Sequence, residues 1–464
     1  MTTSGLTKIV TAIGLAALAL GSLPAVASAE SEQFASPTGK ATGDCRIKSS
    51  PCSLTHAVER ASTRDTVFLL PGRYTVAAGL WPQQSVNFAG APGSMPVVDF
   101  GRFTMAQVSA AHPLAVGALD VYGSNIQNIK FVGESDDAPI LNFDDASAGT
   151  LDNSSIRGYM DRVVVEGSGS ATPLAMMGGL RNSIVTTSNA PYALEGVGSV
   201  IGSTVINTRS LSAAIRVMQT REPSGLEQLH SSLYVRNSIV RGQGGAENVE
   251  TIGPSIDIDW SDVEGTGDVA VSVPPASATI TVGAHMTTAD PGFVSATDLA
   301  LQSSSPLIDA GASAQDLGLA SLSEITAKDL GVSDVFGNRR IRAGSIGGQL
   351  AVPDVGGIEF QPPTPTVSVA KVSAKKARAG TSNAVSFRLS GGANIQIFLQ
   401  RVQRSRATNV ASRKAKLGAG TASYRFLLKA GRKKLAKGQY RFAITPTSLD
   451  GVAGKVAYVP FKVV

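Results

Sequence analysis

A run of acidic residues near the middle of the chain is the strongest candidate for chemistry. Residues 255–264 read SIDIDWSDVE and include Asp257, Asp259, Asp262 and Glu264. In an extended strand, Asp257 and Asp259 project from the same face, roughly 7 Å apart. Ca²⁺ prefers carboxylate oxygens as ligands, and two such carboxylates can also act as acid and base in glycoside hydrolysis. The segment is therefore a candidate calcium site or glycan-cleaving site.

Three neighbouring residues complete this candidate site. Trp260 is one of 2 tryptophans in the chain, and its ring could stack on a sugar. Arg236 and Arg241 lie one structural repeat earlier and could neutralise substrate charge or act as the base of a lyase. The alternative is a solvated acidic face, because Asp is common at turns. The sequence favours this alternative over catalysis and leaves all three interpretations open.

Composition and motifs exclude many other chemistries. The 464 residues contain 2 Cys and 4 dispersed His, which rules out a four-cysteine zinc site, an iron–sulfur site and a His-rich metal cluster. The sequence has no Gly-x-Ser-x-Gly, P-loop, dinucleotide-binding or HExxH motif. A hydrophobic content of 43% and 49 Gly are typical of a folded, turn-rich chain.

Charge is distributed very unevenly along the chain. Residues 361–464 hold 20 Lys and Arg but one acid, Asp450, whereas residues 1–360 hold 21 Lys and Arg and 34 acids. The basic part is expected to bind an anionic polymer. Two alternatives are that its charges only keep it soluble or that it docks on the acidic part. Specific nucleic-acid recognition is not expected, because the basic part has no Trp and few aromatic residues among its basic ones.

The N-terminus predicts export. Lys8 precedes the apolar run Ile9–Leu20, and Ala27-Ser-Ala29 fits a signal-peptidase site, so residues 1–29 are predicted to be a signal peptide. We expect the mature protein to be extracellular or envelope-associated and to have no transmembrane anchor. In an oxidising compartment Cys45 and Cys52 are expected to form a disulfide. This disulfide and a short helix capped by Ser53 would make residues 30–64 an N-terminal cap.

From Asp65 the chain consists of short apolar runs separated by turn residues, which predicts β-strands. Later strands align on one inward hydrophobe at intervals of 34, 20, 21, 34 and 23 residues. Three short strands with their turns need 20 to 25 residues, so the period predicts a parallel solenoid with three strands per coil. The aligned residues are Phe131, Val165, Val185, Ile206, Val240 and Val263.

Two further columns of this alignment predict contacts between or outside the coils. Asn128, Asn182 and Asn237 lie three residues before their hydrophobes, where stacked side-chain amides are expected to hydrogen-bond along the solenoid. A second column contains the aliphatic residues Val164, Ile184, Val205 and Ile239, which should face outward. We expect an extra loop from one of the long repeats to cover this apolar stripe; the alternative is an intermolecular contact face.

The end of the acidic part resembles a known family. Several of its segments resemble secreted bacterial proteins of the pectate-lyase-like superfamily, choice-of-anchor Q type. These segments are Asp290–Phe293, Ser305–Gly311, Asp334–Arg339 and Asp354–Phe360, and the resemblance extends to the Cys45–Cys52 cap and to Pro71–Thr75. The resemblance implies an exported right-handed parallel β-helix over residues 65–360. It implies no single reaction.

The basic part is predicted to be a separate small domain. Residues 361–368 form a Pro-rich linker, and residues 369–464 alternate in six or seven strands, as in an antiparallel β-sandwich. The segments Leu435–Arg441 and Asp450–Gly451 resemble immunoglobulin-like modules of exported bacterial proteins.

The sequence thus predicts an all-β, cell-surface-associated protein with a recognition or structural role that binds polysaccharide or another anionic envelope polymer. The alternative is a polysaccharide-active enzyme, a lyase or glycoside hydrolase, with its site near Asp257–Trp260. No cofactor is expected apart from calcium, if the acidic run binds it.

Overall fold

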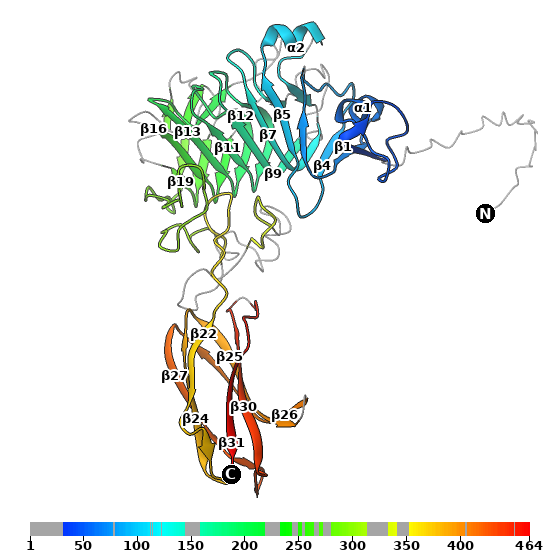
Figure 1. Cartoon of the computed structure of the whole chain (residues 1–464). Helices are drawn as coiled ribbons and strands as arrows, with labels where there is room; N and C mark the ends of the chain where they lie inside the picture. The colour runs from blue at the N-terminus through cyan, green and yellow to red at the C-terminus, as the bar shows by residue number, and fades with distance from the viewer. Residues whose placement is uncertain are drawn as a thin grey trace, which may run out of the picture.

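The computed structural model shows a parallel solenoid followed by an antiparallel unit (Figure 1). It describes residues 31–77, 79–111, 113, 115–121, 123–143, 158–218, 233–243, 249–252, 256–263, 269–271, 280–312, 333–340, 352–403, 406–449 and 451–464. The predicted signal peptide and Glu264 lie outside these residues. The expected fold class, all-β with a right-handed parallel β-helix and a small sandwich, is confirmed.

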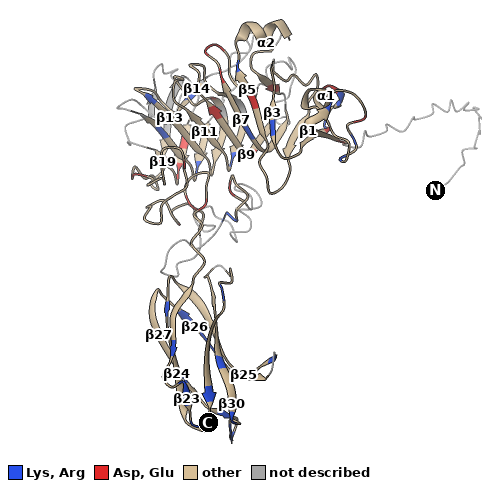
Figure 2. Ribbon diagram, viewed as in Figure 1, with Lys and Arg blue, Asp and Glu red and all other residues tan. Residues whose placement is uncertain are grey.

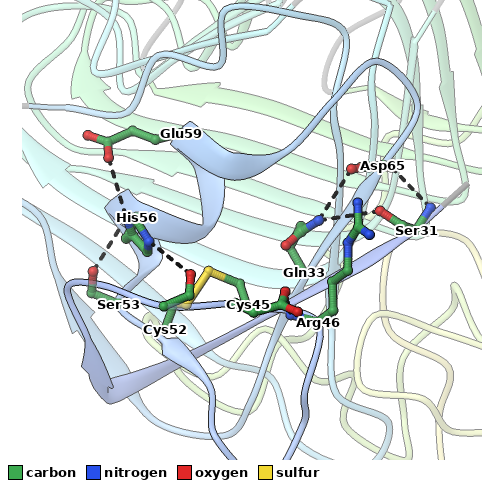
Figure 3. Close-up of a disulfide and its surroundings, with 11 residues drawn as sticks. Ser31, Gln33, Cys45, Arg46, Cys52, Ser53, His56, Glu59 and Asp65 are labelled. Atoms are coloured by element: carbon green, nitrogen blue, oxygen red, sulfur yellow. Dashed lines mark hydrogen bonds and ion pairs between the residues drawn. A yellow bond between two sulfur atoms is a disulfide. The ribbon is translucent and has the colours of Figure 1, made fainter.

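The solenoid begins with a strand that the sequence did not predict. Strand β1 (Glu32–Lys40) pairs in parallel with β2 (Thr66–Leu69), so part of the predicted cap already belongs to the first coil. Asp65 joins the two, because its carboxylate accepts hydrogen bonds from the backbone N–H groups of Ser31 and Ser62, both at 3.0 Å (Figure 3). Burial opposes ionisation of Asp65, but these hydrogen bonds hold its pKa below the usual value.

The short helix and the disulfide that were predicted within residues 30–64 are both present. Helix α1 (Leu54–Arg60) begins after Ser53, whose hydroxyl accepts a hydrogen bond from the backbone of His56 at 3.4 Å. Leu54 and its neighbours on one face are buried, which fixes the helix against the solenoid end. The predicted disulfide between Cys45 and Cys52 is confirmed (Figure 3).

A second short helix, α2 (Met105–Ala111), was not predicted. Of its residues, Val108 is buried, and this single apolar anchor gives too weak a periodic signal for sequence analysis. Among the described residues, no helix is long and apolar enough to cross a membrane.

Parallel pairing along the solenoid joins β1 to β21 into one continuous sheet. The strands after β2 are β3 (Arg73–Thr75), β4 (Asn87–Gly90), β5 (Val97–Arg102), β6 (Leu119–Val121), β7 (Asn125–Glu134), β8 (Leu141–Phe143), β9 (Gly158–Gly167), β10 (Leu174–Arg181), β11 (Ile184–Thr187), β12 (Leu194–Ile201), β13 (Thr204–Ser210), β14 (Ile215–Met218), β15 (Leu233–Arg236), β16 (Ile239–Gln243), β17 (Val249–Ile252), β18 (Ile256–Asp259), β19 (Asp262–Val263), β20 (Val269–Val271) and β21 (Ile280–Val282).

The register corrects one position of the predicted repeat. Val185 pairs with Val205, and Val205 with Val240, so Val205 is the inward residue and Ile206 faces outward. The observed intervals are 34, 20, 20, 35 and 23 residues. The error arose because Val205 and Ile206 are both β-branched aliphatics, and period-two alternation alone does not decide which of two adjacent apolar residues points inward.

The expected asparagine ladder is wrong, because serines form the ladder instead. The column occupied by Asn128, Asn182 and Asn237 adopts positive φ, which is the left-handed conformation of a tight turn. The next residue in four successive coils is a fully buried serine: Ser183, Ser203, Ser238 and Ser261.

Each serine hydroxyl links two coils. The Ser203 hydroxyl accepts a hydrogen bond from the backbone N–H of Ser183 at 3.2 Å and donates one to the carbonyl oxygen of Ile201 at 3.0 Å. Ser238 and Ser261 accept from the preceding serine in the same way, each at 3.2 Å. The hydroxyl thus satisfies a backbone N–H group that the turn removes from the sheet.

The outward aliphatic stripe is covered, but not by a loop from a long repeat. The C-terminal segment of the solenoid lies over it, and we call its described parts, residues 290–312, 333–340 and 352–360, the closing segment. Val164 and Ile184 pack against Val335 and Ile358 of this segment. Ile239 packs in a second cluster with residues that include Leu307. Intramolecular burial therefore accounts for the stripe, and the proposed intermolecular contact face is wrong for these residues.

Buried charged groups hold the closing segment in place. Arg340 is fully buried and donates a hydrogen bond to the carbonyl oxygen of Gly202 in the solenoid at 3.0 Å. The Asp354 carboxylate accepts hydrogen bonds from the backbone N–H groups of Asp309 and Phe360. Burial raises the pKa of Asp354 to about 7, although these hydrogen bonds and the charge of Arg340 act in the opposite direction.

The antiparallel unit after the linker consists of two main sheets packed on a common core. Their orders are β22-β24-β27 and β23-β31-β30-β25-β26, and the core includes Phe387 from the first and Phe442 and Phe461 from the second. The strands are β22 (Val367–Val372), β23 (Lys376–Ala377), β24 (Ser382–Leu389), β25 (Ala393–Gln403), β26 (Arg406–Leu417), β27 (Gly420–Leu427), β28 (Lys429–Ala430), β29 (Lys433–Lys434), β30 (Gly438–Thr447) and β31 (Ala457–Val463).

Candidate functional site

The predicted acidic run follows the alternation expected for a strand. In β18, Ile256 and Ile258 are buried in the solenoid core, so Asp257 and Asp259 project to the outside. Trp260 then makes the turn with φ 51°. Asp262 begins β19 on the other side of this turn.

Asp257 is paired with the arginine of the preceding coil. The Arg236 guanidinium lies 2.9 Å from its carboxylate and 4.0 Å from the centre of the Tyr234 ring. Arg236 is largely buried, whereas 43% of the Asp257 side chain is exposed. The Arg236 guanidinium therefore already provides a counter-charge for the Asp257 carboxylate.

Asp259 is paired with a histidine that sequence analysis did not select. Its carboxylate accepts a hydrogen bond from the backbone N–H of His285 at 3.0 Å and lies 3.3 Å from Nδ1 of the His285 ring. Partial burial opposes ionisation, but the backbone N–H groups of His285 and Trp260 and the His285 ring together hold the pKa of Asp259 below its usual value. The rings of Trp260 and His285 stack with their centres 3.9 Å apart, so one face of the indole is already covered.

Asp262 and Arg241 form a separate, buried ion pair. Two nitrogens of the Arg241 guanidinium donate to the two oxygens of Asp262, each at 2.8 Å, and Asp262 is fully buried. This bidentate geometry is typical of structural Arg–carboxylate pairs. Arg241 also donates to the backbone carbonyl of Ala289, next to the closing segment.

The predicted site residues therefore fall into three pairs. Arg236–Asp257 and Asp259–His285 lie on the outer face of β15 and β18, whereas Arg241–Asp262 lies beyond the turn. Among the described residues, Asp257, Asp259 and Asp262 do not belong to any group of three potential ligands with donor atoms within 4.8 Å of one another. Arginines already provide counter-charges for two of these three carboxylates, and Glu264, the fourth predicted calcium ligand, lies outside the described residues.

A polar column on another face of the solenoid was missed by sequence analysis. Glu195 and Arg216 are register partners in β12 and β14, and Arg216 lies between the buried residues Ile215 and Val217. The Arg216 guanidinium lies 5.1 Å from the centre of the Tyr192 ring, and its buried Nε atom has no hydrogen-bond partner. The sequence pattern that could have indicated this column is a charged residue between two apolar residues, as in Ile215-Arg-Val217. The strand has only four residues, which is too short for the alternation to stand out.

A cleft with a volume of about 580 Å³ lies between the outer face of the solenoid and the closing segment. One wall carries the ion pair Lys130–Glu166, with nitrogen and oxygen 2.6 Å apart. Its floor is formed by the aliphatic stripe, and hydroxyl groups of Thr186, Thr208 and Thr297 line it. The cleft can therefore accommodate a small ligand with both apolar and hydroxyl-bearing surfaces.

The electrostatic character of the two units differs. In the solenoid, cations such as Arg73, Lys130 and Arg241 are paired with carboxylates. In the sandwich, by contrast, no Lys or Arg lies within ion-pair distance of a carboxylate, as far as the described residues extend. Figure 2 shows Lys and Arg spread along its strands. The sandwich surface is therefore a concentrated source of unneutralised positive charge.

Comparisons with known proteins add little to this geometry. No protein-family model matches the chain, and no curated protein matches it. Among solved structures, the chain is similar to that titled "Crystal structure of pectate lyase Pel9A", with 14% sequence identity and a TM-score of 0.34. The match covers 72% of this chain and 97% of the pectate lyase chain.

Proposed function

We propose that this is an exported, cell-surface-associated β-helix protein with a recognition or structural role, which binds polysaccharide or another anionic polymer of the cell envelope. The observation that carries the proposal is the positive charge of the sandwich, whose Lys and Arg side chains have no ion-pair partner among the residues that the structure describes. Its 104 residues after Phe360 contain 20 Lys and Arg and one acid. Such a surface attracts polyanions, and its positive charges repel one another when no anion is bound.

Export is part of this proposal. It is supported by the signal-peptide pattern of residues 1–29 and by the Cys45–Cys52 disulfide, since disulfides persist mainly in oxidising compartments. Outside the cell, anionic polysaccharides and phosphate-containing wall polymers would be the abundant partners. The sandwich would then attach to such a polymer, while the outer faces and the cleft of the solenoid stay exposed to solvent.

The test is binding of the mature chain, residues 30–464, to isolated cell walls over a series of NaCl concentrations. We expect binding that weakens steeply with salt, because released counter-ions drive the association. A chain that ends at residue 360 should lose this binding while retaining the unfolding transition of the solenoid. Undiminished binding by the truncated chain would refute attachment through the sandwich.

A second candidate function is a polysaccharide-active enzyme, either a lyase or a glycoside hydrolase. The Asp259–His285 pair favours it, because a carboxylate that holds an exposed imidazole in one orientation is a common arrangement in general acid–base catalysis. Arg236 and Tyr234 lie on the same outer face and would contact an acidic sugar.

The enzyme candidate is tested by incubating residues 30–464 with acidic polysaccharides, with and without Ca²⁺, and recording the ultraviolet absorbance of unsaturated sugars and the release of reducing ends. Activity lost in Asp259→Asn and His285→Gln, but retained in the solvent-exposed control Asp44→Asn in the cap, would support an enzyme. Absence of product with every substrate, together with salt-sensitive wall binding, would leave the attachment function alone.

A further inference from the structure

The end of the sandwich farthest from the linker carries a dense group of cations. Strand β24 runs from Ser382 to Leu389, and Leu389 pairs with Val367, the first residue of β22, which begins at the second-to-last residue of the predicted linker. Residues close to Ser382 therefore lie at the opposite end. The hairpin β28–β29 is held there, because the backbone N–H of Leu428 donates to the carbonyl oxygen of Thr381 at 2.8 Å.

We call this group the basic tip and define it by six exposed residues. The hairpin contributes four of them, and the adjoining segment before Thr381 contributes two. They are Lys376, Arg378, Lys429, Arg432, Lys433 and Lys434. Lys437 and Lys462 extend the tip, since Lys462 is the register partner of Lys376 and Lys437 directly precedes β30.

The hairpin places two like charges directly opposite each other. Lys429 and Lys434 are direct cross-strand partners, and Gly431, with φ 61°, makes the tight turn between their strands. Like charges directly opposite each other destabilise a strand pair, and a hairpin with two residues per strand has little other stabilisation. A bound anion between the two ammonium groups would remove this repulsion.

The composition of the tip indicates which anion fits. Six of its eight cations, counting Lys437 and Lys462, are lysines. The planar fork of Arg binds both carboxylate and phosphate through two hydrogen bonds, whereas Lys acts as a point charge and in that form is a common ligand of phosphate. A tip made mainly of lysines therefore fits phosphate groups that are contacted from several directions. The nearby aromatic residues Tyr440 and Phe461 are buried, so the tip has no exposed ring from them on which a nucleic-acid base could stack.

We propose that the basic tip is the binding site for a phosphodiester-containing envelope polymer, and that the sandwich attaches to it end-on. This inference rests on the proposed function and specifies its site and ligand class. End-on attachment places the linker, and therefore the solenoid, on the side away from the polymer.

The experiment compares two triple variants of residues 30–464 that have the same net charge. The tip variant is Lys429→Gln, Lys433→Gln and Lys434→Gln. The control is Lys371→Gln, Arg388→Gln and Lys414→Gln, three exposed positions on the sides of the sandwich or near its linker end. Affinity for poly(glycerol phosphate) is measured at several NaCl concentrations, with polygalacturonate and duplex DNA at equal charge concentration as alternative ligands.

We expect the tip variant to lose roughly 100-fold in affinity for poly(glycerol phosphate), since each Lys near an anionic surface contributes about a factor of 5. The control should lose less than about 5-fold, because its charges act only at long range. A second readout is the unfolding temperature of Lys434→Gln: without ligand, it should equal or exceed that of the wild type at low salt.

Three outcomes would overturn the inference. Equal losses in the tip and control variants would mean that the positive charge of the whole sandwich, not the tip, determines binding. Stronger binding of polygalacturonate would exclude the phosphodiester class, and stronger binding of DNA would exclude an envelope polymer as the preferred ligand. The first two leave the proposed attachment function intact. That function fails separately, if the chain truncated at residue 360 still binds walls.

Discussion

Breaking the Arg241–Asp262 ion pair is expected to destabilise the solenoid by about 3–5 kcal/mol, the usual effect of removing one partner from a buried pair. Asp262 is fully buried, and the Arg241 side chain is 14% exposed. In Asp262→Asn the side-chain shape is kept, but the guanidinium loses the counter-charge that accepted two hydrogen bonds at 2.8 Å. Each charge-assisted hydrogen bond contributes about 1.5–3 kcal/mol, which agrees with the same total.

The assay is urea unfolding of residues 30–464, followed by tryptophan fluorescence; both tryptophans, Trp81 and Trp260, belong to the solenoid, and Trp260 lies two residues from Asp262. Asp257→Asn is the matched control, because this Asp also pairs with an arginine of the preceding coil but is 43% exposed. We expect the control to cost less than about 1 kcal/mol. The double variant Arg241→Met/Asp262→Leu should return close to wild-type stability, since two apolar side chains leave no unpaired charge.

A free-energy cost of Asp262→Asn as small as that of Asp257→Asn would refute a stabilising role of this ion pair. The same conclusion would follow if the double variant were as unstable as the single one. Stabilisation of the wild type by Ca²⁺ that disappears in Asp262→Asn would contradict this role in another way. That result would mean that the carboxylate binds a metal ion rather than serving only Arg241.

Three other perturbations test the fold. Replacing Cys45 and Cys52 by serine should lower stability by about 2 kcal/mol, because the short disulfide loop is freed; the unfolding temperature should then no longer respond to reductant. Ser203→Ala should cost about 1–3 kcal/mol in urea unfolding, since a buried backbone N–H loses its acceptor, and a cost equal to that of the exposed control Ser188→Ala would contradict the serine ladder. Asp354 has a folded pKa of about 7, above its ordinary 3.8, so the folded state binds the proton more tightly and stability should fall as pH rises from about 4 to about 7, then level off. Asp354→Asn should flatten this slope in thermal unfolding between pH 5 and pH 8, and an unchanged slope would rule out Asp354 as its cause.

Local sequence patterns were sufficient to predict the helix of the cap and the coils of the solenoid. The Ser53 N-cap and the apolar face that includes Leu54 predicted α1, because both signals act within a few residues. The repeat of inward hydrophobes predicted the parallel solenoid, since each coil must place an apolar side chain above the previous one. The exception was Val205, where an adjacent aliphatic residue made the register ambiguous.

The candidate site was predicted only in part. The acids at Asp257 and Asp259 were found because strand alternation places both outside. Their partners were not: His285 lies 26 residues beyond Asp259 and carries no local signal. The pairing of Asp262 with Arg241 depends on the number of residues between coils, which varies from repeat to repeat.

By itself, the sequence determined the period of the solenoid, the disulfide-linked cap and the separation of a basic sandwich from an acidic body, because each depends on neighbouring residues or on composition. Only the tertiary structure decided which surface is covered, which carboxylates are neutralised and where the lysines of the sandwich gather. These properties depend on contacts between residues far apart in the chain. The closing segment illustrates the reason: Ile358 covers Val164 across 194 residues, and burial of both apolar surfaces, not any local pattern, selects that contact.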